Sequence, residues 1–239
     1  MLPIVDIPPV RWWITDFPIP YEESNKIMEN EVQIIARGDV EELVWVLEHP
    51  AMYTGGTSAN CQDLLSYKRF PVYRTGRGGG YTYHGPGQLT VYCMLNLKKR
   101  NKDIRCFIAS LEEIIIRTLK QLGITGERRE DRVGIWVVRP QKTTSSPLVE
   151  EKIAAIGIRI KKWVSFHGFS INIDPDLSHY DGIIPCGINK YGVTSLKDLG
   201  FFYTKEYVHS IIRESFESIF GPTELREYKK QIPLNPINN

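Results

Sequence analysis

Three segments with strand-like composition follow one another between residues 133 and 173, at 133–138, 152–160 and 166–173. The link at 139–151 is polar and carries two prolines, which is typical of a hairpin loop. Parallel neighbours in a sheet need a crossover of about a dozen residues or more, usually a helix. The direct succession of strands therefore favours an α/β domain of the α+β type with a mixed sheet, over a regularly alternating parallel sheet.

Helical spacing of apolar residues predicts three helices around these strands. The first covers 21–37 and ends before Gly38, the second runs from Asp103 to 122, and the third covers about 205–220. Further strands are expected at 11–15, 42–48, 72–74 and 89–97. The sequence thus predicts a mixed sheet flanked by helices.

The 239 residues, of which 42% are hydrophobic, suit one globular domain. We expect a single domain over 1–239, with 1–20 as an extended arm and 222–239 as a tail. The net charge of +2, from 30 basic and 28 acidic residues, gives no reason to expect nucleic acid or a membrane as partner. No apolar run approaches the roughly 20 residues of a membrane span.

The N-terminus lacks the basic and apolar regions of a signal peptide. The four cysteines, at 61, 93, 106 and 186, form no C-x-x-C pair and no disulfide-dense pattern. We therefore expect reduced thiols and a cytoplasmic location.

The stretch 75–88 holds six glycines between two strand-like segments. Glycine is costly in backbone entropy and is kept where the backbone must approach something closely. No Gly-Lys-Ser/Thr follows, and both possible dinucleotide registers lack their third glycine. The stretch also leads into a strand, so no helix N-terminus receives a phosphate. It predicts the wall of an elongated ligand site, in which His84 is either a site residue or a structural histidine.

Cys186 differs from the other cysteines because Pro185 and Gly187 bracket it in a loop. A free cysteine is usually a small buried hydrophobe, which is the interpretation for Cys93 and Cys106. Proline fixes the approach of the chain and glycine removes bulk beside the sulfur. This context makes Cys186 a candidate nucleophile.

A nucleophilic cysteine needs help, because its unperturbed pKa of about 8.5 leaves little thiolate at neutral pH. Lys152 is a candidate partner, since it opens a strand whose next residues are almost all apolar or small. A surface lysine at the end of a polar loop is the simpler interpretation from sequence alone. His167, on the neighbouring predicted strand, is the other candidate base.

These pieces, in this order, resemble the lipoyl(octanoyl) transferases, the octanoyl-[acyl-carrier-protein]:protein N-octanoyltransferases. The resemblance spans about 43–200, and its most specific part is the Arg-Gly-Gly…His-Gly-Pro-Gly-Gln run. Its segments are 48–50 with 53–54, then 77–88, 152–157, 167–172, 184–188 and 193–196. One departure is Gly80, where the family often has a larger polar residue.

The resemblance implies the fold of the biotin/lipoate protein ligases, with Cys186 as nucleophile and Lys152 as its partner. It also implies which residues line the acyl site. These are Arg77, Gly78, Gly79, Gly80, Tyr81, Thr82, Tyr83, His84, Ala155, Ile156, Gly157, Gly168, Phe169 and Ser170.

The implied reaction moves an octanoyl group from octanoyl-acyl carrier protein to a lysine, through a thioester on Cys186, without cofactor or metal. The implied acceptors are the lipoyl domains of 2-oxoacid dehydrogenase complexes and the glycine cleavage H protein. Two alternatives remain: an ATP-dependent lipoate or biotin ligase, and a non-catalytic module that binds acyl carrier protein. A basic cluster either steers the acidic donor or is a solvated turn. It consists of Lys98, Lys99, Arg100, Lys102 and Arg105.

Overall fold

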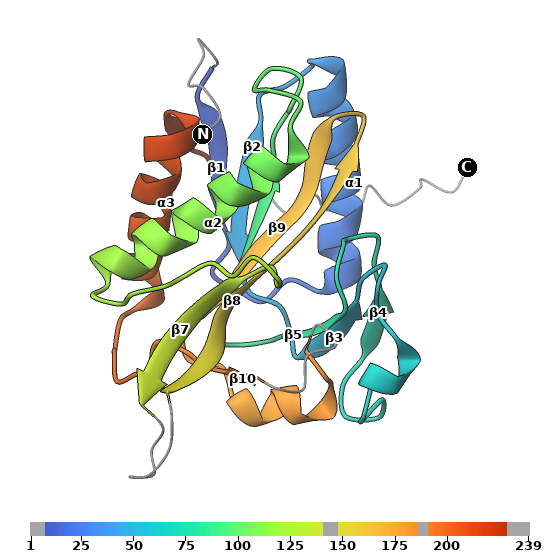
Figure 1. Cartoon of the computed structure of the whole chain (residues 1–239). Helices are drawn as coiled ribbons and strands as arrows, with labels where there is room; N and C mark the ends of the chain where they lie inside the picture. The colour runs from blue at the N-terminus through green and yellow to red at the C-terminus, as the bar shows by residue number, and fades with distance from the viewer. Residues whose placement is uncertain (1–7, 141–147, 186–190, 229–239) are drawn as a thin grey trace.

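The structure is a computed structural model, which describes residues 8–140, 148–185 and 191–228. Helices α2 (Ile104–Gln121) and α3 (Lys205–Phe220) cover one face of a large sheet, and α1 (Tyr21–Arg37) covers the other (Figure 1). Three layers thus enclose two hydrophobic cores, one on each side of the sheet.

The large sheet is mixed, as predicted. Its strand order is β10-β8-β9-β6-β2-β1-β11, with β7 beside β8. In this sheet β1 pairs in parallel with β2 and β11, and β8 pairs in parallel with β10. The other strand pairs of the sheet are antiparallel. Its strands are β1 (Val10–Ile14), β2 (Leu43–Leu47), β6 (Gln88–Met94), β7 (Ile135–Pro140), β8 (Leu148–Lys161), β9 (Val164–Asn172), β10 (Gly192–Val193) and β11 (Thr223–Leu225).

The central strand β2 explains how both faces are covered. Val44 and Val46 pack into the core under α2 and α3, whereas Trp45 and Leu47 pack into the core under α1. Every residue of β2 is buried, which is typical of a strand between two helical layers.

The predicted helices form with the expected ends. The Asp103 side chain caps α2 by accepting a hydrogen bond from the Cys106 N–H at 3.0 Å. Gly38 ends α1 with a φ of 87°, a left-handed conformation that glycine adopts without strain. No helix in the described ranges combines the length and the apolar character needed to cross a membrane.

A second, three-stranded sheet was not predicted. It has the order β4-β3-β5 and consists of β3 (Met52–Gly55), β4 (Val72–Arg74) and β5 (Tyr81–His84). β5 lies within the glycine-rich stretch 75–88, and β3 lies outside the strands expected from the sequence. The expected tail also begins with a strand, because β11 pairs with β1 at the edge of the large sheet.

Candidate functional site

A cavity whose empty space, open solvent included, is about 540 Å³ lies where the small sheet meets β8 and β9. Of the predicted acyl-site residues, those that line it are Arg77, Gly79, Thr82, His84, Ala155, Ile156, Gly157, Gly168, Phe169 and Ser170. The structure therefore brings together three segments that are far apart in the sequence.

Two glycines face each other in the wall of this cavity. Gly157 of β8 and Gly168 of β9 are direct partners in the strand register. A Cβ atom on Gly157 would stand 2.9 Å from Cδ of Arg77, too close for an ordinary contact. The missing side chain thus lets the Arg77 stem lie against β8, as expected where glycine interrupts a strand.

Arg77 is fixed within the glycine-rich stretch by three hydrogen bonds. Its Nη2 donates to the carbonyl and the hydroxyl oxygens of Thr54, at 2.7 and 2.8 Å. Its Nη1 donates to the carbonyl of Gly78 at 2.9 Å. The side chain is 91% buried, and these bonds join the stretch to β3.

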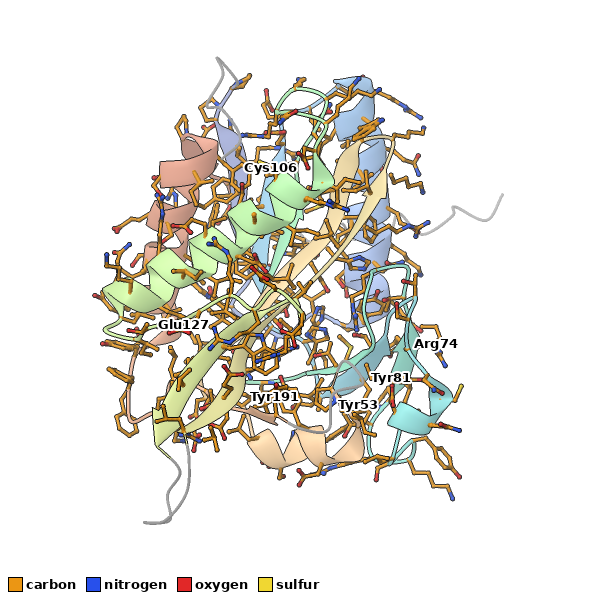
Figure 2. The ribbon with its side chains drawn as sticks, viewed as in Figure 1. Tyr53, Arg74, Tyr81, Cys106, Glu127 and Tyr191 are labelled. Carbon is orange, nitrogen blue, oxygen red and sulfur yellow. The ribbon has the colours of Figure 1, made fainter. Side chains whose placement is uncertain are left out.

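The alternation of β5 divides its side chains between two environments. Thr82 and His84 line the cavity, whereas Tyr81 and Tyr83 pack into a small aromatic core with Tyr53. Figure 2 shows Tyr53 and Tyr81 together at the small sheet. Tyr81 and Tyr83 therefore support the wall from behind, rather than lining it as predicted, because a strand sends successive side chains to opposite faces.

Gly78 and Gly80 are not among the residues that line the cavity; they connect backbones around it. The N–H of Gly78 donates to the carbonyl of Ile158 at 3.0 Å, which ties the stretch to β8. The carbonyl of Gly80 accepts a hydrogen bond from the Gly56 N–H at 3.2 Å.

The lining of a second, smaller cavity, whose empty space is about 280 Å³ with open solvent included, contains Lys152. Its lining shares Thr82, Ala155 and Ser170 with the larger cavity, so the two adjoin. Pro185, which immediately precedes Cys186 in the chain, also lines it. Cys186 itself lies outside the described residues.

Lys152 is 94% buried, which corrects the interpretation as a surface lysine. Its Nζ lies 4.8 Å from the centroid of the Trp136 ring, its cross-strand neighbour on β7. An ammonium group over an indole face is attracted by the ring quadrupole. The large buried ring thus fixes the amine at the edge of the small cavity.

A hydrogen-bonded network forms the wall opposite Lys152. The Asn172 Oδ1 accepts bonds from Gln88 Nε2 at 2.9 Å and from the Tyr180 hydroxyl at 3.1 Å. Asn172 Nδ2 donates to the Thr194 carbonyl at 2.9 Å. Since Asn172 and Tyr180 line the small cavity, the network makes that wall rigid.

His167 lines the large cavity but not the small one that contains Lys152. Its register partner Ile158 is six residues from Lys152 along β8, roughly 20 Å at about 3.3 Å per residue. His167 therefore lies far from Lys152, and as a candidate base for Cys186 it stays a prediction, since Cys186 lies outside the described residues. His167 adopts a φ of 66°, and its Nδ1 is buried without a hydrogen-bond partner among the described residues.

The histidines around the large cavity are neutral at pH 7. Burial lowers the pKa of His49 to about 4 and, with nearby Arg77 and Arg159, that of His167 to about 3. Burial, with His49 and Arg77, also holds the pKa of His84 well below its usual value. His49 Nδ1–H donates to the Ile19 carbonyl at 2.6 Å, so its Nε2 accepts from the Tyr92 hydroxyl at 2.7 Å.

These depressed pKa values predict a loss of stability in mild acid. Below pH 6.5 the unfolded chain binds a proton at His49 and the folded chain does not. The free energy of unfolding therefore decreases as the pH is lowered. His49 alone accounts for a loss of about 2 kcal/mol between pH 7.5 and pH 5. The free energy of unfolding is measured in urea at pH 7.5 and pH 5. Its decrease between the two pH values should be smaller by about 2 kcal/mol in His49→Gln than in the unmodified protein.

His179→Gln, at a half-buried histidine outside this cluster, is the matched control and should leave the drop close to that of the unmodified protein. An equal drop in His49→Gln and in the unmodified protein would contradict the burial of a neutral His49.

The basic cluster at 98–105 has fewer exposed cationic side chains than its sequence suggested. Arg100 is buried and pairs with Glu42, with Nε donating to both carboxylate oxygens at 3.0 and 2.9 Å. Lys102 lies over the ring of Trp163 at the β8–β9 turn. That turn is nine residues from Lys152, roughly 30 Å along β8. The exposed part of the cluster therefore lies far from Lys152 and the small cavity.

Residues that line the large cavity but were not named as acyl-site residues are Tyr21, Thr54, Thr75, Thr90 and Tyr92, although Thr75 opens the stretch 75–88 that was predicted as the wall. Tyr21 begins α1, and no local pattern connects it to the glycine-rich stretch. Thr90 and Tyr92 alternate along β6, so their common face could have been inferred once β6 and β9 were paired. Among the described residues, no group of three or more histidine, cysteine or acidic side chains could hold a metal ion.

Comparison with known proteins identifies the family of the chain. Residues 20–217 match the lipoyl protein ligase A/B catalytic domain family. Proteins named octanoyltransferase from Agrobacterium fabrum and Rhizobium johnstonii are 57% and 56% identical to the chain. Both alignments cover 93% of this chain, and they cover 84% and 94% of the two relatives, respectively.

Solved structures confirm the expected fold. A lipoate-protein ligase A bound with ATP matches with a TM-score of 0.69 at 14% identity, over 93% of this chain and 90% of that protein. A bipartite lipoate protein ligase from Thermoplasma acidophilum gives 0.67 at 14% identity, over 93% and 88%. At this identity the likeness establishes the fold alone. The family match and the close relatives together show that the chain belongs to the lipoyl protein ligase A/B family and, within it, to the octanoyltransferases.

Proposed function

We propose that the chain transfers an octanoyl group from a thioester donor to a lysine of a lipoyl domain, with Cys186 as the nucleophile. The observation that carries the proposal is the joining of two cavities. The lining of one includes the apolar residues Ala155, Ile156 and Phe169, which suits an acyl chain. The other holds Lys152 together with Pro185, the residue next to Cys186.

In the first step, Lys152 takes the thiol proton of Cys186, and the resulting thiolate attacks the carbonyl carbon of the octanoyl thioester. A new carbon–sulfur bond forms and the bond to the donor sulfur breaks. The donor thiolate leaves and takes the proton from Lys152. The octanoyl group is then held as a thioester on Cys186, with its apolar chain along β8.

In the second step, the amine of the acceptor lysine attacks this thioester. The amine must be neutral, and a lysine with a pKa of about 10.4 is mostly charged at neutral pH. An amide bond forms, the bond to Cys186 breaks, and Lys152 takes the proton that the amine loses. A buried lysine in reach of both sulfur and amine can therefore serve both steps.

The proposed donor is octanoyl-acyl carrier protein. The proposed acceptors are the lipoyl domains of 2-oxoacid dehydrogenase complexes and the H protein of glycine cleavage. The relatives named octanoyltransferase support octanoyl as the transferred group. We also propose a cytoplasmic location. Thioester-to-amide exchange is energetically downhill, so no ATP is consumed.

The test is transfer without nucleotide. The chain is incubated with octanoyl-acyl carrier protein and a lipoyl domain, and the mass of the lipoyl domain is measured. We expect one added octanoyl group per domain in the absence of ATP. A parallel reaction supplies free octanoate and ATP. Transfer only in that second reaction would indicate a ligase, and binding without transfer in either would indicate a non-catalytic module.

A further inference from the structure

The ring of Trp136 contacts two cationic side chains at once. Nζ of Lys152 lies 4.8 Å from the ring centroid, and Cζ of Arg132 lies 4.6 Å from it. Trp136 is 98% buried and Arg132 is 91% buried. An arginine that the proposed chemistry does not use is thus separated from the reactive lysine by one aromatic ring.

The backbone holds Trp136 firmly at this point. Its N–H donates to the Glu127 carbonyl at 3.0 Å, and its carbonyl accepts from the Glu127 N–H at 2.8 Å. Glu127 lies in the segment that leads to β7 (Figure 2). The strand register shifts between Ile135 and Trp136, which places Trp136 opposite Lys152.

Arg132 also contacts the segment that follows Cys186. Its Cζ lies 4.0 Å from the ring centroid of Tyr191, where the described chain resumes. The Tyr191 ring meets the Trp136 ring edge-on, at 5.3 Å and 68°. Figure 2 shows Tyr191 beside the β7–β8 hairpin in this view. Arg132 therefore stacks on both aromatic rings.

The segment on the other side of Cys186 is fixed by a different element. Pro185 forms a bridge with Tyr81 of β5 and lines the cavity of Lys152. The two residues that bracket 186–190 thus contact the two structures around Lys152: the small sheet on one side, and the Arg132–Trp136 stack on the other.

Two acidic residues fix the guanidinium in turn. Arg132 pairs with Asp131 at 2.7 Å and with Glu150 of β8. Glu150 also pairs with Arg129, at 2.6 Å. A planar guanidinium with a carboxylate at its edge can keep its face against an aromatic ring, which an ammonium group cannot do.

We propose that Arg132 is a positioning residue for the transfer reaction. It holds Trp136 and Tyr191 in place, and so fixes the amine of Lys152 relative to Pro185 and Tyr191, the described residues on either side of Cys186. Arg132 touches none of the reacting atoms. The proposal rests on the proposed function for its kinetic consequence, but the alignment itself is a property of the unreacted protein.

The test compares Arg132→Met with Arg129→Met. Both variants remove an arginine that pairs with Glu150, but Arg129 stacks on no aromatic ring among the described residues. For Arg132→Met we expect octanoylation of Cys186 in a single turnover to slow by about 10- to 100-fold, the effect of a small misplacement of catalytic groups. The KM for the donor should stay within about twofold of that of Arg129→Met, because the large cavity is untouched.

A second measurement needs no acyl donor. Alkylation of Cys186 by iodoacetamide reports its thiolate, and it should slow by about 10-fold in Arg132→Met, since a displaced Lys152 stabilises the thiolate less. Alkylation of exposed Cys61, followed by peptide mass spectrometry in the same sample, is the internal control. This measurement remains informative if the unmodified protein proves unable to transfer an octanoyl group.

Arg132→Lys separates charge from stacking. It keeps the cation but loses the planar group, so its rates should fall between those of Arg132→Met and the unmodified protein. If Arg132→Met does not fold, Tyr191→Leu replaces it, since that half-buried ring can be removed without leaving an unpaired buried charge. Octanoylation and alkylation at the rates of Arg129→Met in the folded variant would overturn the proposal.

Discussion

Replacement of Cys186 by serine is expected to abolish octanoyl transfer. A serine hydroxyl is not ionised by a nearby lysine at neutral pH, so neither the thioester on the enzyme nor the amide on the acceptor forms. We expect turnover to fall by about 10³-fold or more, as it does when the nucleophile of a covalent enzyme is removed. Intact-protein mass spectrometry after incubation with octanoyl-acyl carrier protein should show one added octanoyl group in the unmodified protein and none in Cys186→Ser.

Cys106→Ser is the matched control. Cys106 is half-buried on α2, on the side of the molecule away from Tyr53 and Tyr81 (Figure 2). This variant should become octanoylated at the normal rate. Transfer at the original rate by Cys186→Ser would exclude covalent catalysis by this residue and would favour direct attack of the acceptor amine on the donor.

Lys152→Ala is expected to slow transfer by about 10²- to 10⁴-fold, the usual contribution of a general acid–base group. The fold should survive, since the cavity beside Lys152 leaves room for water at the site of the lost amine. Steady-state transfer and thermal unfolding are measured on the same preparation. Lys161→Ala, at the far end of the same strand, should transfer at the normal rate.

Lys152→Arg divides the two roles proposed for this residue. A guanidinium is always protonated, so it can stabilise a Cys186 thiolate that has lost its proton to water, but it cannot accept the proton of the attacking amine. Octanoylation of Cys186 should therefore be less impaired than transfer to the acceptor, and the octanoyl-enzyme should accumulate. A normal rate of transfer in either lysine variant would remove Lys152 from the mechanism.

The three helices could be predicted closely because local signals set their ends. The Asp103 cap and the left-handed Gly38 act within one turn of the helix, so they are visible in the sequence. The strands β3 and β5 could not be predicted in this way. Each has four residues next to glycine, and each is stabilised by pairing with the other, about thirty positions away in the chain.

The cavity wall could be predicted as segments, but not residue by residue. The resemblance to the octanoyltransferase family indicated the segments 77–84, 155–157 and 168–170. Which side chains of 81–84 face the cavity depends on where β5 begins. Because β5 begins at Tyr81, its tyrosines point away from the cavity and Thr82 and His84 point into it. The contribution of Tyr21 depends on how α1 packs on β9, which no local pattern of residues encodes.

The pairing of β1 with β11 has a consequence for synthesis of the protein on the ribosome. Within the described chain, β1 is made before β2, with which it pairs along one edge. Its partner along the other edge, Thr223–Leu225, is made after nearly all of the described chain. Until then this edge of β1 presents unpaired backbone groups, which can recruit strands from other nascent chains. Pairing with β11 covers the edge and removes this route to association.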